Sequence, residues 1–230
     1  MAGNLYILPT PIGNLEDITL RALRILKEVD LIAAEDTRTI QKILNHYQIH
    51  NHTTSYYEAN RESKGPQLIQ QLQEGKNIAL VSESGTPGVS DPGCHLIKSA
   101  IDAQITVIPL PGPSAVITAL VASGLPTNSF VFLGFLPRKP GKIIKELKQA
   151  SQLETTVIFF ESPHRIIKTL ELVRVNLGEV NIVVSRELTK KFEEILRGTP
   201  TSILAHFSKN LPRGEMVVAF QSLNKKLTSS

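Results

Sequence analysis

The feature that most constrains the fold of this chain is a regular alternation of short apolar runs and helical patterns in its first half. Runs rich in branched residues, typical of buried strands, occupy Asn4–Leu8, Asp30–Glu35, Asn77–Ser82 and Ile105–Leu110. Stretches with one apolar helical face lie at Thr19–Val29, Thr37–His46, Arg61–Gln73, Asp91–Ala103 and Ser114–Ser123. This alternation predicts parallel strands joined by helical crossovers, and therefore an α/β domain with a mostly parallel sheet.

The second half of the chain changes character. Five short strands are predicted there with longer connections, at Phe130–Gly134, Thr155–Glu161, Asn181–Glu187, Phe192–Arg197 and Glu215–Phe220. More strands per residue favour a mixed sheet of the α+β type. We therefore predict two domains, an N-terminal α/β domain at residues 1–115 and a C-terminal α+β domain at residues 116–230.

Several protein classes are excluded by simple absences. The sequence has no apolar stretch near the ~18 residues that a membrane span requires, and Met1–Leu8 lacks the features of a secretion signal. Cys94 is the only cysteine, so the chain can form neither an intrachain disulfide nor a multi-cysteine metal site. Neither of the two common glycine-rich nucleotide loops occurs. We expect a cytoplasmic protein with no metal site and no membrane association.

Net charge differs sharply between the two halves. Residues 1–115 carry nine Lys and Arg against twelve Asp and Glu, whereas residues 116–230 carry sixteen against nine. The overall charge of +4 therefore combines a half at −3 with a half at +7. Such asymmetry favours a polyanionic partner for the C-terminal half, although a merely solvated, lysine-rich surface explains the charge alone equally well.

Proline- and glycine-rich loops follow the predicted strands of the first half. They are Pro9–Asn14, Ser82–Gly93 and Pro111–Ser114, and Glu35–Arg38 ends the second strand. Because the carboxyl ends of parallel strands share one edge of a sheet, these loops are expected to meet there, where open α/β sheets bind ligands. Glycine lets a ligand approach the backbone closely, and proline fixes the turns.

Polar residues also gather at strand ends in the basic half. Glu161–Arg165, Ser185–Lys191 and Pro212–Met216 each end or precede a predicted strand. An Arg–Glu pair at such a position is as often a structural ion pair as a functional one. The stretch Leu136–Lys142 leads into a further predicted helix and contributes to a group of cations that we call the basic segment, namely Arg138, Lys139, Lys142 and Lys145.

These motifs, in this order, resemble one family. The runs that carry the resemblance are Leu8–Leu15, Ala34–Arg38, Ser82–Asp91, Pro111–Ser114, Glu161–Arg165 and Arg186–Lys190, and it covers about residues 4–220. The chain is similar to the ribosomal RNA small subunit methyltransferase I family, a branch of the tetrapyrrole methylase superfamily. It departs from the family pattern at Glu83 and Ser84, where members tend to have Asp and Ala, and it ends at Ser230 without the C-terminal segment of longer members.

The resemblance implies a two-domain tetrapyrrole-methylase-like fold that binds S-adenosylmethionine in a cleft between the domains. The implied reaction is 2′-O-methylation of a cytidine ribose in the decoding region of 16S rRNA, within the small ribosomal subunit. A homodimer is compatible with this reading. The expected cofactor contacts are Pro9, Gly13, Ser82, Glu83, Ser84, Gly85, Thr86, Pro87, Pro111, Gly112, Ser114, Ala115 and Met216.

The chemistry asks mainly for alignment of the ribose hydroxyl and exclusion of water, because the sulfonium is already a good methyl donor. A base near the hydroxyl would add about 10²–10⁴-fold. Asp36, Glu187 and Glu161 are candidates for it, and we expect Asp36 beside the ribose, with Arg38 orienting Asp36 or an RNA phosphate. The expected RNA contacts are the basic segment together with Arg165, Arg186 and Lys190.

Two other functions fit parts of the sequence. A methylase acting on a tetrapyrrole would share the fold, but it has no need of a strongly basic C-terminal half. A non-catalytic RNA-binding or ribosome-assembly module would use the basic half, but it would not require the strand-end loops. Labelled methyl transfer to immature small subunits, free RNA, porphyrinogen or buffer separates these functions.

Overall fold

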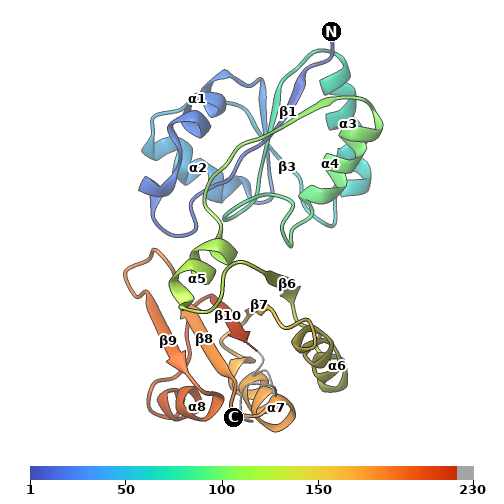
Figure 1. The fold of residues 1–230 in the computed structure, drawn as a ribbon. Coiled ribbons are helices and arrows are strands. Elements are labelled where there is room, and N and C mark those ends of the chain that lie inside the picture. The colour runs from blue at the N-terminus through green and yellow to red at the C-terminus, as the bar shows by residue number, and fades with distance from the viewer. Residues whose placement is uncertain (222–230) are drawn as a thin grey trace. The chain divides into compact units, whose positions relative to one another are not determined.

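The computed structural model describes residues 1–221 and divides the chain into two compact units, Met1–Ser114 (unit 1) and Ala115–Ser230 (unit 2). Figure 1 shows an α/β ribbon for each unit. The sequence-based division, between residues 115 and 116, lies one residue further along the chain. Among the described residues, none of the helices has the length and apolar character needed to cross a membrane.

Unit 1 contains a five-stranded sheet whose neighbouring strands are all parallel, in the order β3-β2-β4-β1-β5. Its strands are β1 (Asn4–Ile7), β2 (Leu31–Ala34), β3 (Thr53–Ser55), β4 (Ile78–Val81) and β5 (Thr106–Pro109). Its helices are η1 (Leu15–Asp17), α1 (Leu20–Glu28), α2 (Thr37–His46), α3 (Arg61–Gln73) and α4 (Gly93–Asp102). The predicted mostly parallel α/β sheet is therefore confirmed.

Two apolar cores lie on opposite faces of this sheet. Residues of α1 and α2 pack with one set of strand side chains, while residues of α3 and α4 pack with the alternate set. The two helix pairs accordingly flank the strands in Figure 1. Strand β4 shows why the pattern was readable, because Ile78–Val81 is apolar at all four positions and buried at all four, as expected of a strand covered on both faces.

Unit 2 contains a mixed sheet in the order β6-β7-β10-β8-β9, in which only β6 and β7 pair in parallel. Its strands are β6 (Phe130–Phe135), β7 (Thr156–Glu161), β8 (Asn181–Arg186), β9 (Glu194–Gly198) and β10 (Met216–Gln221). Its helices are α5 (Ala115–Ser123), α6 (Pro140–Ser151), α7 (Ile166–Leu177) and α8 (Pro200–Lys209). This mixed sheet was predicted.

The helices of unit 2 cover its sheet unequally. Side chains of α6, α7 and α8 share one core with Val157, Phe159, Val184 and Met216. Helix α5 packs on β7, β8, β9 and β10 from the other side, where the alternate strand residues point. One predicted boundary was wrong here, because β9 begins at Glu194 rather than Phe192.

Candidate functional site

Two loops at the carboxyl edge of the unit 1 sheet are joined by backbone hydrogen bonds. The N–H of Thr10, after β1, donates to the Gly85 carbonyl at 2.9 Å, and the N–H of Gly85, after β4, donates to the Thr10 carbonyl at 3.0 Å. The hydroxyl of Thr10 donates to the Ser82 carbonyl at 3.3 Å, and Thr10 itself is buried. These hydrogen bonds therefore fix the loops after β1 and β4 to each other.

The loop after β5 contacts the same two loops. The Thr86 hydroxyl donates to the Pro113 carbonyl, after β5, at 3.0 Å. A Cβ atom on Gly112 would come within 2.8 Å of Pro9 Cβ, so the chain needs glycine where the loops after β5 and β1 touch. The three proline- and glycine-rich loops thus meet at one sheet edge.

Asp91 closes the second half of the loop after β4. Its carboxylate accepts hydrogen bonds from the N–H of Gly88 at 2.8 Å and from the N–H of Gly93 at 2.7 Å. Gly88 has a φ of 87° and Ser90 a φ of 63°, so the loop turns back sharply in left-handed conformations. The sequence placed Asp91 in this loop but gave no sign of its loop-closing role.

Asp36 lies at the end of β2, where it caps α2. One carboxylate oxygen accepts the Arg38 N–H at 2.8 Å, and the other lies 2.6 Å from Arg38 Nη2. Hydrogen bonds from the Arg38 side chain, followed by the bond from its backbone, lower the pKa of Asp36 to about 2. The carboxylate is consequently ionised at neutral pH.

Glu35, the neighbour of Asp36, was not singled out by sequence reasoning. Its Oε2 accepts the N–H of Glu83 at 3.4 Å, which links the end of β2 to the loop after β4. Burial raises the pKa of Glu35; the Glu83 N–H opposes this effect, while the charges of Glu83, Asp91 and Asp36 add to it. Only the position of Glu35 at the end of a predicted strand could have indicated this link from the sequence.

Most of the predicted cofactor residues lie in the loops at this edge of unit 1, and two belong to unit 2. Ala115 is the first residue of α5, and Met216 opens β10, so both belong to unit 2. Met216 is 2% exposed, and its side chain packs in the core with residues of α6, α7 and α8. The side chain of Met216 is therefore part of the apolar core of unit 2.

In unit 2, a buried carboxylate organises the end of β7. Glu161 accepts hydrogen bonds from the Ser162 N–H at 2.8 Å and the Thr169 hydroxyl at 2.7 Å, and its Oε1 lies 3.5 Å from Arg165 Nε. Arg165 in turn donates to the carbonyls of Leu136 at 3.1 Å and Pro137 at 2.6 Å. The guanidinium thus holds the backbone immediately before the basic segment.

A second network fixes the end of β8. The Glu187 carboxylate accepts the Glu215 N–H and the Lys190 ammonium, both at 3.1 Å, and Lys190 Nζ also lies 2.8 Å from a Glu215 oxygen. Burial alone would raise the pKa of Glu187, but these donors outweigh it and lower that pKa. A Cβ on Gly214, whose φ is 81°, would overlap the Glu187 carboxyl group, so a side chain there would displace this carboxylate.

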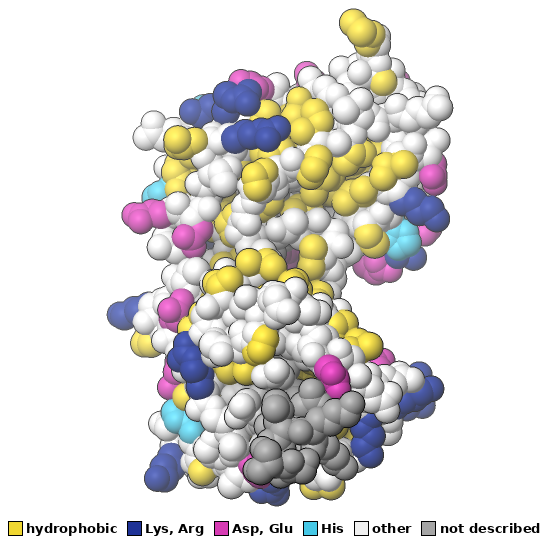
Figure 2. Space-filling view, viewed as in Figure 1, with side chains coloured by type: hydrophobic (Ala, Val, Ile, Leu, Met, Phe, Trp, Pro, Cys, Tyr) yellow, Lys and Arg dark blue, Asp and Glu magenta, His cyan; other side chains and the backbone are white. Residues whose placement is uncertain are grey.

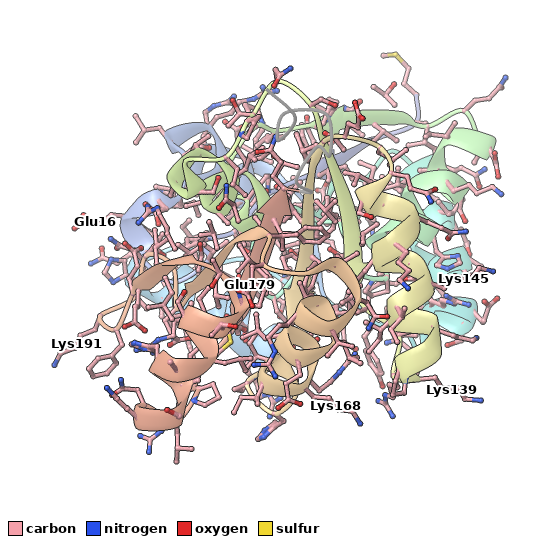
Figure 3. All side chains as sticks on the ribbon, turned by 60° about the horizontal axis from the view of Figure 1, so that its bottom comes forward. Glu16, Lys139, Lys145, Lys168, Glu179 and Lys191 are labelled. Carbon is pink, nitrogen blue, oxygen red and sulfur yellow. The ribbon has the colours of Figure 1, made fainter. Side chains whose placement is uncertain are left out.

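The predicted RNA-contacting cations fall into two groups. Arg165 and Lys190 are engaged as described, and Arg186 pairs with Glu194 at 2.6 Å. The basic segment is exposed, and within residues 1–221 no carboxylate lies within 4 Å of its charged groups. Figure 3 shows Lys139 and Lys145 projecting outward from α6. In the same described range, no cluster of His, Cys, Asp and Glu is suited to a metal ion.

Solved structures share this fold at low sequence identity. Diphthine synthase matches with a TM-score of 0.76 and 13% identity, covering 96% of this chain and 90% of that one. Uroporphyrin-III-C-methyltransferase from Thermus thermophilus matches with a TM-score of 0.65 and 20% identity, covering 94% of both chains. These likenesses concern the fold alone.

Sequence comparison is more specific. The tetrapyrrole (corrin/porphyrin) methylase family matches residues 4–203. Ribosomal RNA small subunit methyltransferase I of Halalkalibacterium halodurans is 48% identical over 98% of this chain and 78% of its own length. The protein of that name from Bacillus subtilis is 46% identical over 97% of this chain and 77% of its own length. The chain therefore belongs to the tetrapyrrole methylase family, in its ribosomal RNA small subunit methyltransferase I branch.

Proposed function

We propose that this protein is an S-adenosylmethionine-dependent methyltransferase of rRNA in the small ribosomal subunit, and that it methylates the 2′-hydroxyl of a cytidine in the decoding region of 16S rRNA. The observation that carries the methyltransferase assignment is the joined set of loops at the carboxyl edge of unit 1. The chain is also 46–49% identical to proteins named ribosomal RNA small subunit methyltransferase I. The ribose and the cytidine come from the family resemblance.

The residues at the sheet edge fit the cofactor. Gly13, Ser84 and Gly112 are exposed there and present backbone and hydroxyl groups suited to the polar ends of S-adenosylmethionine. Carboxylates of Glu35 and Glu83 favour a bound cation such as the sulfonium. When bound, the cofactor supplies an activated methyl group.

The protein's own residues have to position and orient the ribose hydroxyl. We assign Asp36 as a hydrogen-bond acceptor for this hydroxyl and Arg38 as the group that orients the Asp36 carboxylate. A pKa of about 2 makes Asp36 a weak base, so orientation contributes more than proton removal. Glu187 has its Oε1 occupied by Glu215 and Lys190, and we assign it a positioning role.

RNA binding is assigned to the basic segment. Its members cluster in the turn before α6 and in the first turns of that helix, although cations there oppose the helix dipole and destabilise the helix. These cations are unfavourable for folding and have no carboxylate partner within residues 1–221, so they are available for phosphate. On the face drawn in Figure 2, Lys and Arg side chains also lie along the left, right and lower margins of unit 2.

Labelled methyl transfer tests the proposal. The expected result is transfer from S-adenosylmethionine to immature small subunits, with resistance to alkaline cleavage appearing at one cytidine of 16S rRNA. Porphyrinogen, free RNA and buffer serve as the other acceptors. Transfer to porphyrinogen but not to subunits would overturn the rRNA assignment, and a modified base with an unprotected ribose would overturn the 2′-O assignment.

A further inference from the structure

The hairpin tip between β8 and β9 has an unusually fixed backbone. Glu187 and Thr189 have φ values of 49° and 65°, which are unfavourable for residues other than glycine. The Lys190 N–H donates to the Glu187 carbonyl at 3.0 Å, the Glu193 N–H donates to the Lys190 carbonyl at 3.1 Å, and the Thr189 N–H donates to Glu193 Oε2 at 2.6 Å. These bonds hold the strained turn in one shape.

This rigid tip displays an aromatic ring and a cation. Phe192 is 65% exposed, and Lys191 Nζ lies 5.7 Å from the centre of its ring, within cation–π range. Lys191 is also exposed, and no carboxylate of residues 1–221 lies within 4 Å of its ammonium. Figure 3 shows Lys191 projecting outward, on the opposite side of unit 2 from Lys139 and Lys145.

The acidic residues of the tip are engaged within the hairpin. Glu193 is turned back onto the Thr189 N–H, and the Glu187 and Glu215 carboxylates are held by Lys190. Lys190, which the sequence suggested as an RNA contact, therefore stabilises the hairpin, and Lys191 is the cation that the hairpin presents.

We propose that Phe192 stacks on an unpaired nucleobase of the rRNA substrate while Lys191 contacts a neighbouring phosphate. Aromatic side chains beside cations are the usual means of holding splayed-out bases in single-stranded RNA. This inference rests on the proposed function, because it takes the substrate to be RNA.

An RNA base suits this tip better than a protein partner does. One Phe buries about 150–250 Å², far below the ~800 Å² per partner of a stable protein interface, whereas it covers a single base well. The hairpin also belongs to β9, at the opposite edge of the sheet from β6 and the basic segment that follows it. Residues 116–230 carry a net charge of +7, and a long RNA can contact both edges of the unit 2 sheet at once.

The absence of tryptophan from the sequence allows a direct test. Phe192→Trp would introduce the only indole, and its fluorescence should be of the exposed type in the free protein and quenched when immature small subunits bind. Phe192→Ala should weaken subunit binding about tenfold, within the range for loss of one stacked base, and leave S-adenosylmethionine affinity unchanged. Leu153→Ala, at a residue 60% exposed after α6, is the matched control and should bind normally.

Three results would overturn the inference. The first is subunit binding by Phe192→Ala that equals that of the wild-type protein. The second is a buried-type emission of the Phe192→Trp protein that RNA does not change. The third is an emission shift of that protein that depends on its concentration, which would indicate a contact between protein copies. Failure of the proposed function looks different, because the wild-type protein would then transfer no methyl group to subunits.

Discussion

Gly85 offers a sharp test of the joined strand-end loops. Its φ of 79° lies in the left-handed region, where an L side chain costs about 1–2 kcal/mol. A Cβ atom there would lie 3.4 Å from Ile12 Cγ2 and 3.7 Å from the Pro113 carbonyl oxygen, which leaves room for a methyl group but little more. Alanine therefore adds mainly backbone strain, whereas the two further methyl groups of valine have to displace the loops after β1 or β5.

Gly85→Val should raise the dissociation constant for S-adenosylmethionine more than tenfold, a loss of at least ~1.4 kcal/mol. Gly85→Ala should raise it by less than about threefold. Titration calorimetry of the wild-type protein and both variants measures these changes directly, and circular dichroism establishes that each protein is folded.

Gly124 provides the matched control for backbone strain. Its φ is also 79°, and a Cβ atom there would have nothing within 4 Å. Gly124→Ala should lower the melting temperature by several degrees, as Gly85→Ala should, without changing cofactor affinity. A folded Gly85→Val protein with wild-type affinity would refute the reasoning, because the loops would then be irrelevant to the cofactor.

Three further predictions concern orientation, RNA binding and positioning. Asp36→Asn should lower turnover at saturating RNA more than it lowers cofactor affinity, and unchanged turnover would make Asp36 structural. Because the pKa of Asp36 is about 2, below its ordinary 3.8, the wild-type pH–rate profile should show no inflection from this group above about pH 4. Alanine at all four positions of the basic segment should flatten the log–log salt dependence of subunit binding by about 0.7–0.9 per lost contact, and lines of equal slope would place these side chains in solvent. Arg165→Ala should weaken subunit binding in the wild-type background and have no further effect in the four-alanine background, since Arg165 acts through the carbonyls that it holds; additive losses would show that it contacts RNA itself.

Elements with strong periodicity were predictable, and weak ones were not. The apolar run of β4 and the helical face of α1 were read correctly from local patterns, because burial of these residues follows from their spacing. Strand β3 was missed because Thr53–Ser55 is short, polar and only half-buried at the edge of the sheet. Pairing with β2 makes this segment a strand, and the local sequence does not indicate that pairing.

The contacts within the candidate site were less predictable than its position. Strand ends indicated where the loops would gather, but no local pattern shows that Arg165 reaches back to Leu136, 29 residues earlier. Met216 opens the run Met216–Gln221, which is apolar on both faces, so alternation does not reveal which face meets the helices. Those choices depend on strand order and register, which arise only in the folded chain.

The place of β1 in its sheet has a consequence for folding during synthesis. This strand is made first, yet it lies between β4 and β5, with Leu5 paired to Ile78 on one side and to Val107 on the other. At translation rates of about 5–20 residues per second, roughly 5–20 s separate β1 from its second partner. During this interval Leu5 and Leu8, both fully buried in the finished sheet, have no native neighbours on the β5 side. A nascent chain halted before Thr106 would therefore expose the unpaired β5 side of this central strand to chaperones and proteases.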